Sequence, residues 1–92
     1  MARLSMNNFV FTKTAWEQYL QWQKKDKKMI KKINQLIKDI DGNGLLKGTG
    51  KPEPLKYRKA YSRRIDNEHR LVYDMDENEN LIIYSCMYHY EE

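Results

Sequence analysis

The chain has 92 residues, a length that allows one domain. Its composition, 40% hydrophobic and 12% aromatic, is too apolar for an intrinsically disordered protein. No run of about 18 apolar residues predicts a transmembrane helix. The single cysteine, Cys86, excludes an internal disulfide framework and a cysteine-based zinc site. We therefore expect a folded cytoplasmic protein.

Positive and negative charges are separated along the sequence. Residues 1–70 hold all 17 Lys and Arg and 7 acidic residues, a balance of +10, whereas residues 71–92 hold 6 acidic residues and no Lys or Arg, a balance of −6. A basic body of this kind attracts polyanions, because phosphate contacts release counterions. A solvated surface that keeps a small protein soluble would have the same composition, so charge alone leaves both interpretations open.

The N-terminal part predicts a leader, a strand and the start of a helix. We expect residues 1–8 to form a flexible leader before the domain. The aromatic and β-branched run at residues 9–12 predicts a short strand. Thr12 or Thr14 can cap the helix that follows, because a threonine hydroxyl accepts from a free backbone N–H.

The first predicted helix carries most of its apolar residues at helical spacing. Trp16, Tyr19 and Leu20 form the apolar stripe, which we expect to be its core face. Trp22 lies six residues beyond Trp16 and off that face. It is therefore a candidate subunit contact.

The second predicted helix has the clearest periodicity in the sequence. Asp26 is its expected N-cap, and Gly42-Asn43-Gly44 is its expected end. Its apolar residues follow the spacing of one helical face, with lysines over much of the rest: Met29, Ile30, Ile33, Leu36, Ile37 and Ile40. This helix is expected to supply a large part of the core.

The sequence of the second half of the chain predicts a loop followed by strands. Residues 45–54 contain two glycines and two prolines and predict a loop. Four strands are expected after it, at residues 55–58, 61–66, 69–74 and 81–88. Helices that precede a block of hairpin-linked strands predict an α+β fold, with two N-terminal helices packed on a small twisted antiparallel sheet. We expect residues 1–92 to form this one domain.

Several side chains in these strands could carry chemistry. In the run 61–66 alternate side chains share a face, so Arg63 should share the buried face of Ile65 while Arg64 projects to the open face. Arginines on an open sheet face can bind RNA phosphates, but cross-strand ion pairs with nearby acidic residues would explain them equally well.

Two further candidates lie outside this cluster. Glu53 stands between Pro52 and Pro54, which stiffen its backbone, although a rigid loop with an exposed carboxylate would look the same. His89 is flanked by tyrosines. A carboxylate, an imidazole and arginines are the parts of a metal-free ribonuclease. No metal-ligand spacing or phosphate-binding loop is present in the sequence, so no metal or cofactor is expected.

Beyond these single residues, the chain resembles the YoeB-type toxins of the RelE superfamily from about residue 9 to residue 90. The similarity rests on segments in a fixed order and spacing: Trp16-Glu17-Gln18-Tyr19-Leu20-Gln21-Trp22-Gln23, Asp26-Lys27-Lys28, Ile33-Asn34-Gln35-Leu36-Ile37-Lys38-Asp39, Gly50-Lys51-Pro52-Glu53-Pro54-Leu55-Lys56, Ser62-Arg63-Arg64-Ile65, Glu68-His69-Arg70-Leu71-Val72-Tyr73 and Tyr88-His89-Tyr90. Any one of them alone would be a weak signal, and together they are specific.

The resemblance implies a microbial-RNase-like fold and a toxin that cuts mRNA in the ribosomal A site of bacteria. It implies neutralisation by a YefM-type antitoxin, with a homodimer as a further possibility. It also assigns roles to particular residues: Glu53 is the general base, His89 the general acid, Arg70 the ligand of the scissile phosphate, Tyr90 a residue that orients RNA, and Arg64 and Lys56 are further phosphate contacts. Arg63, which belongs to the same basic cluster as Arg64 and Arg70, is a further candidate for phosphate binding.

Two departures from the family pattern keep other functions open. The segment from Lys56 to Ser62 is two residues shorter than is usual, and Glu91 and Glu92 follow the terminal Tyr90. Carboxylates beside His89 would repel phosphate. A catalytically weakened homologue that binds the antitoxin as a co-repressor is therefore the alternative, and a ribosome-independent ribonuclease is a third possibility.

Overall fold

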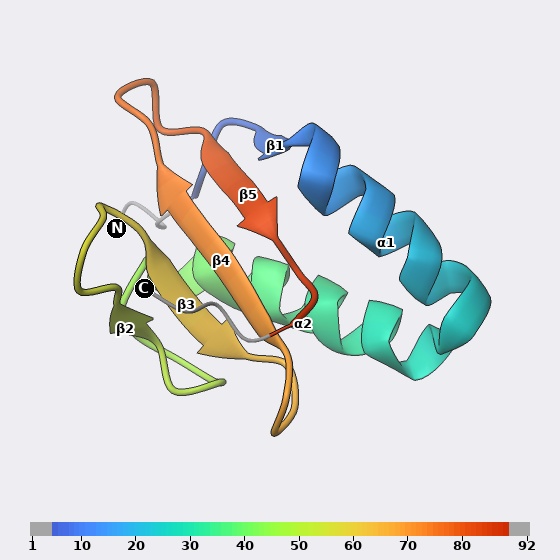
Figure 1. Ribbon diagram of the computed structural model, residues 1–92. Coiled ribbons are helices and arrows are strands. Elements are labelled where there is room, and N and C mark those ends of the chain that lie inside the picture. Colours follow the sequence, from blue (N-terminus) through green and yellow to red (C-terminus); the bar gives the residue numbers. More distant parts are fainter. Residues whose placement is uncertain (1–4, 89–92) are drawn as a thin grey trace.

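The computed structural model describes residues 5–88 and has two helices followed by most of a five-stranded sheet (Figure 1). The elements are β1 (Phe9–Phe11), α1 (Lys13–Lys25), α2 (Lys27–Asn43), β2 (Glu53–Pro54), β3 (Tyr61–Arg64), β4 (Arg70–Met75) and β5 (Leu81–Ser85). The helices cover one face of the sheet and leave the other face toward the viewer in Figure 1. The predicted α+β class is confirmed. No described helix is long and apolar enough to cross a membrane.

The sheet is mixed, whereas an antiparallel sheet was expected. Its strand order is β1-β5-β4-β3-β2, and the three pairs from β5 to β2 are antiparallel. The edge strand β1 runs parallel to β5, with Phe9 opposite Leu81. Parallel neighbours need a long connection. Both helices and three strands lie between β1 and β5, so no hairpin constrains their relative direction.

The caps and the core face of α2 follow the sequence prediction. Thr12 accepts from Ala15 N at the start of α1, and Asp26 accepts from Lys28 N at the start of α2. α2 ends at Gly44, whose φ of 93° suits a residue without a Cβ. The buried residues of this helix are five of the six in the predicted stripe: Met29, Ile33, Leu36, Ile37 and Ile40.

The predicted core face of α1 is wrong at Trp16 and Leu20, which are exposed, whereas Tyr19 is partly buried against the core. Trp16 is 49% exposed, whereas Trp22 is 4% exposed and Ala15 is fully buried. The helix approaches the segment after β5 closely through the small Ala15, whose carbonyl lies 3.7 Å from the Cys86 thiol. A stripe chosen by size and hydrophobicity therefore missed most of the packed face. Since Trp22 is in the core, it cannot be the subunit contact that we expected.

Several element boundaries also differ from expectation. Residues 55–58 form no strand, and the hairpin instead begins at the two-residue β2. β3 and β5 end before the positions expected for them. Within the span expected to be a leader, Met6 is buried and its backbone N–H donates to Asp41 Oδ1 over 2.6 Å.

Candidate functional site

Three adjacent strands place candidate residues on the sheet face that the helices leave free. Glu53 of β2 lies opposite Ser62 of β3, and Arg64 of β3 lies opposite Arg70 of β4. Directly opposed residues share a face, and so do residues two apart on one strand. Glu53, Arg64 and Arg70 therefore belong to one surface, which three separate segments of the sequence build.

The carboxylate of Glu53 stands on a fixed backbone. Arg64 N donates to Gly50 O over 2.7 Å, which attaches the segment before β2 to the end of β3. Gly50 has a φ of 83°, and a Cβ there would lie about 3.1 Å from Arg64 O. On the other side Leu55 N donates to Ala60 O over 2.9 Å. Glu53 itself is exposed, so its carboxylate is free to meet a large substrate.

Arg63 belongs to the core, so the structure contradicts its assignment to phosphate binding. Its side chain is fully buried, and the guanidinium uses all five of its donors inside the protein. Its acceptors are the Tyr73 hydroxyl, the Asp39 carboxylate and the carbonyls of Thr49, Gly44 and Lys47. Arg63 thus ties α2 and the loop after it to β3 and β4.

Asp39 is the charged partner in this cluster. Burial on its own would raise the pKa of the Asp39 carboxyl, but the pKa is lowered overall by hydrogen bonds from Thr49 N, Arg63 and Asn43 and by the Arg63 charge. Arg63 is consequently paired with α2, and not with the cross-strand acidic residues that the sequence suggested.

Of the candidate arginines, Arg64 and Arg70 lie on the free face. Arg64 is exposed, as the alternation of β3 predicted. Arg70 is half-buried, and within the described residues its guanidinium donates only through Nη1, to the carbonyls of Asp66 and His69 at 3.2 and 3.3 Å. The remaining donors of Arg70 have no partner there. Lys56 is exposed in the segment between β2 and β3.

The turn before β4 is organised by Asp66. Its Oδ1 accepts from the backbone N–H groups of Glu68 and His69, at 2.8 and 2.7 Å. Burial would raise the pKa of the Asp66 carboxyl, and these two hydrogen bonds, with smaller charge effects, lower it overall. Asp66 therefore shapes the turn that presents His69 and Arg70.

The segment after β5 is anchored from two sides. From α1, Trp22 Nε1 donates to Cys86 O over 2.9 Å, and Gln18 Oε1 accepts from Cys86 N over 2.7 Å. From the start of β4, His69 Nδ1 accepts from Tyr88 N over 2.7 Å. The sequence prediction gave no role here to Gln18, Trp22 or His69. The one available signal was the position of His69 at a strand start.

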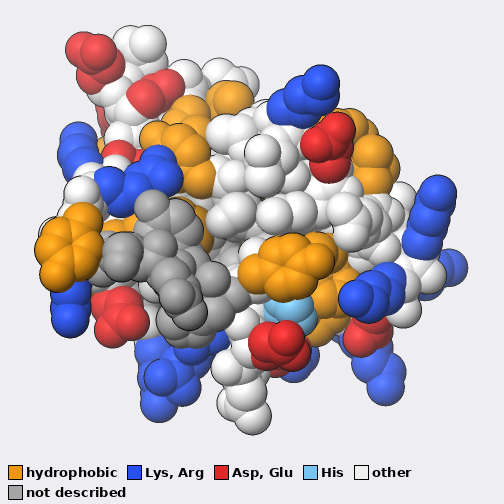
Figure 2. Space-filling model, viewed as in Figure 1, with side chains coloured by type: hydrophobic (Ala, Val, Ile, Leu, Met, Phe, Trp, Pro, Cys, Tyr) orange, Lys and Arg blue, Asp and Glu red, His pale blue; other side chains and the backbone are white. Residues whose placement is uncertain are grey.

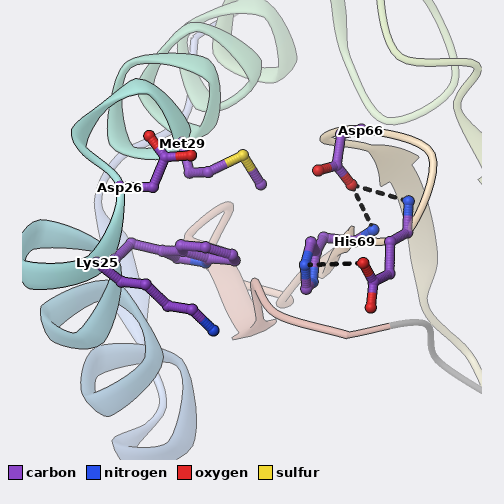
Figure 3. Close-up of a pocket in the computed structure, with 7 residues that line it drawn as sticks. Lys25, Asp26, Met29, Asp66 and His69 are labelled. Carbon is purple, nitrogen blue, oxygen red and sulfur yellow. Dashed lines mark hydrogen bonds and ion pairs between the residues drawn. The ribbon is translucent and has the colours of Figure 1, made fainter.

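A cleft of ≈ 340 Å³ opens beside this anchor (Figure 3). Lys25, Asp26 and Met29 line it from the helices, and Asp66 and His69 from the β3–β4 turn. In the described part of the chain, no group of three or more His, Cys, Asp and Glu is arranged to hold a metal ion. His89 and Tyr90, the predicted acid and RNA-orienting residue, lie outside the described residues.

Charge on the free face is divided. Figure 2 shows Lys and Arg side chains around the margins of this face, while acidic side chains gather at its upper left, over the turn between β4 and β5. The single described His lies near the lower centre, beside an acidic side chain.

Comparison with known proteins gives a consistent result. The model of a family described as YoeB-like toxin of bacterial type II toxin–antitoxin system matches residues 11–90. The Toxin YoeB of Escherichia coli K12 is 47% identical over 83 residues, which cover 88% of this chain and 96% of the relative. A chain from a YoeB–YefM complex of Staphylococcus aureus has a TM-score of 0.83 and 54% identity, covering 97% of this chain and 100% of that one. A YoeB dimer from the same organism has a TM-score of 0.85 and 53% identity, with the same coverage.

Proposed function

This chain belongs to the family of YoeB-like toxins of bacterial type II toxin–antitoxin systems, and from that premise we propose that it is an endoribonuclease that cuts mRNA on the ribosome. The observation that carries the proposal is the common face of Glu53, Arg64 and Arg70. It combines an exposed carboxylate with two guanidinium groups, the set that cleavage by an internal hydroxyl requires.

The proposed reaction uses the 2′-hydroxyl of the mRNA as nucleophile. Glu53 removes its proton, and the oxygen attacks the adjacent phosphorus. Arg70, with Arg64 as auxiliary ligand, stabilises the negative charge that develops on the phosphoryl oxygens. The bond to the 5′-oxygen breaks, and His89 protonates this leaving group. The products are a 2′,3′-cyclic phosphate and a 5′-hydroxyl, with no net proton consumed.

The strand spacing fits a phosphodiester between base and cation. β2 and β4 are separated by β3, and neighbouring strands lie about 4.8 Å apart, so Glu53 and Arg70 are roughly 10 Å apart across the sheet. Their partners on β3, Ser62 and Arg64, are two residues apart, which adds about 7 Å along the strands and gives a backbone separation of about 12 Å. Lys56 and Tyr90 are proposed as further contacts to the RNA.

The ribosome and an antitoxin are the proposed partners. The basic balance of residues 1–70 favours association with ribosomal and messenger RNA. The S. aureus relative is seen with YefM, which supports a YefM-type antitoxin for this chain. The S. aureus dimer supports a homodimer. We place the protein in the bacterial cytoplasm, where its proposed target is.

Translation of a defined mRNA in a cell-free system tests the proposal. Purified protein should produce new 5′ ends inside A-site codons, mapped by primer extension, and only when ribosomes are present. Glu53→Gln and His89→Ala should each slow cleavage by about 10²-fold or more, the usual contribution of a general base or acid. Arg70→Ala should slow it by about 10²–10³-fold.

A matched control is Glu17→Gln, which changes an exposed glutamate of α1 away from the proposed site. Its cleavage rate should equal that of the wild type. Cleavage of naked RNA would favour the ribosome-independent nuclease. A folded wild-type protein that binds ribosomes or antitoxin without cutting would favour the co-repressor.

A further inference from the structure

The backbone of Tyr88 is held in an unusual conformation immediately before the proposed general acid. Its φ is +66°, in the left-handed region that non-glycine residues rarely adopt. Residues kept in such conformations are over-determined by their surroundings and cluster at functional sites. What holds Tyr88 is therefore of interest for the residue that follows it, His89.

Two consecutive residues at the start of β4 hold both polar backbone groups of Tyr88. Its N–H donates to His69 Nδ1 over 2.7 Å, and its carbonyl accepts from Arg70 N over 3.1 Å. The second bond joins two backbone groups, so it does not depend on which side chains occupy these positions. The first depends on one side-chain nitrogen.

The ring of His69 is itself fixed. Its side chain is 12% exposed. The Trp22 ring meets it edge-on, with centroids 4.8 Å apart and planes at 86°. Its backbone N–H is bound by Asp66 Oδ1, as the dashed lines of Figure 3 show. The acceptor for Tyr88 is thus placed by α1 on one side and by the β3–β4 turn on the other.

The hydrogen bond also defines the form of the ring. Nδ1 must offer a lone pair to accept from Tyr88 N, so the proton of the neutral ring is on Nε2. Glu68 Oε1 lies 3.8 Å from Nε2, and an ion pair between them would require a doubly protonated ring. Such a ring could not accept at Nδ1. The 2.7 Å bond is the closer of the two interactions.

We propose that His69 is a positioning residue for the general acid. By accepting from Tyr88 N, it fixes the left-handed turn from which the chain continues to His89. This inference rests on the proposed function, because His89 matters here as the general acid of that reaction. His69 contacts neither substrate nor reacting atoms in the proposal, and it acts through the backbone of Tyr88.

Two substitutions separate the acceptor from the packing of the ring. His69→Phe keeps an aromatic ring against Trp22 but removes the acceptor. His69→Asn keeps an acceptor oxygen near the position of Nδ1 but loses the ring. If the acceptor is what matters, the Phe variant should cut mRNA 10- to 100-fold more slowly than wild type under single-turnover conditions. The Asn variant should recover most of the rate, and the concentration for half-saturation of ribosomes should be unchanged in both.

Exchange of the Tyr88 amide gives a readout that is independent of activity. It should be at least 10-fold faster in His69→Phe than in wild type and close to wild type in His69→Asn. Wild-type activity of the Phe variant, or equal loss in both variants, would overturn the proposal. If the wild type itself does not cut mRNA, the proposed function fails, while the amide exchange still decides whether His69 holds Tyr88.

A spectroscopic measurement covers the case in which His69→Phe does not fold. In wild-type protein labelled with ¹⁵N, the couplings of the ring nitrogens to the carbon-bound ring protons report which nitrogen carries the proton. We expect the proton on Nε2 and none on Nδ1. A proton on Nδ1 of His69 would contradict the proposed hydrogen bond.

Discussion

The buried guanidinium of Arg63 offers the sharpest test of how this fold is held together. Replacing Arg63 with Met keeps a long apolar stem and removes all five donors. It leaves the Asp39 carboxylate and three backbone carbonyls without their partner. Removing one member of a buried ion pair costs about 3–5 kcal/mol, and because the Asp39 side chain is 20% exposed we expect a loss near the lower end of this range. The free energy of unfolding of a domain is about 0.05–0.15 kcal/mol per residue, or roughly 5–14 kcal/mol for 92 residues, so this loss is a large part of it.

Unfolding in urea and by heat, followed by circular dichroism, measures this loss. For a domain of this size each kcal/mol lowers Tm by about 4–8 °C, so Arg63→Met should melt at least about 12 °C below wild type. Arg63→Lys should recover little, because an ammonium has three donors in place of five. Arg64→Met is the matched control, because Arg64 is the exposed neighbour of Arg63, and its free energy of unfolding should stay within about 0.5 kcal/mol of the wild-type value. A loss below about 1 kcal/mol in Arg63→Met would refute the role assigned to this cluster.

Three further predictions follow from buried groups. Trp22→Phe should lower the free energy of unfolding by about 1–3 kcal/mol, because it leaves Cys86 O without its donor. Trp16→Phe, at a half-exposed position, should lower it by less than about 0.5 kcal/mol, and urea titrations measure both values. The pKa of Asp39 is lower in the folded state than its ordinary 3.8. Its contribution to stability is therefore present above pH 3.8 and is lost as the pH falls through the lower folded value. Asp39→Asn should accordingly flatten the acid side of a plot of the free energy of unfolding against pH. Burial raises the pKa of the Cys86 thiol from 9.0 to about 12. Because the thiolate is the reactive form, Ellman's reagent at pH 8 should react at least about 1000-fold more slowly with the native protein than with protein unfolded in guanidinium. Equal reaction rates would contradict this burial.

Periodicity predicted those elements in which one pattern dominates. The stripe of α2 and the caps at Thr12 and Asp26 are local features, because helix spacing and a cap hydrogen bond each involve residues close in the chain. α1 failed for the opposite reason. Its packed face contains Ala15 and Gln18, whose value comes from contacts with Cys86, and neither is marked by hydrophobicity.

The candidate site shows the same limit. Strand alternation predicted that Arg64 would be exposed and Arg63 buried. It could not predict that Arg63 pairs with Asp39, because the two are 24 residues apart and meet only when α2 packs against the sheet. The family resemblance supplied Glu53 and Arg70 as a pair, and register then placed both on one face. The anchor of Tyr88 by His69 joins residues 19 apart, and the position of His69 at a strand start does not predict which backbone group its ring contacts.

The position of β5 has a consequence for when the protein becomes complete. β5 joins β1 to the rest of the sheet, yet it follows every other described element in the chain. During synthesis, β1 therefore has no strand partner until residues 81–83 exist. Contacts that span most of a chain form late, since the long connection must first be closed. A chain built in this way cannot close its five-stranded sheet until residues 81–83 have been synthesised, so the β1–β5 pair couples the first described strand to the last.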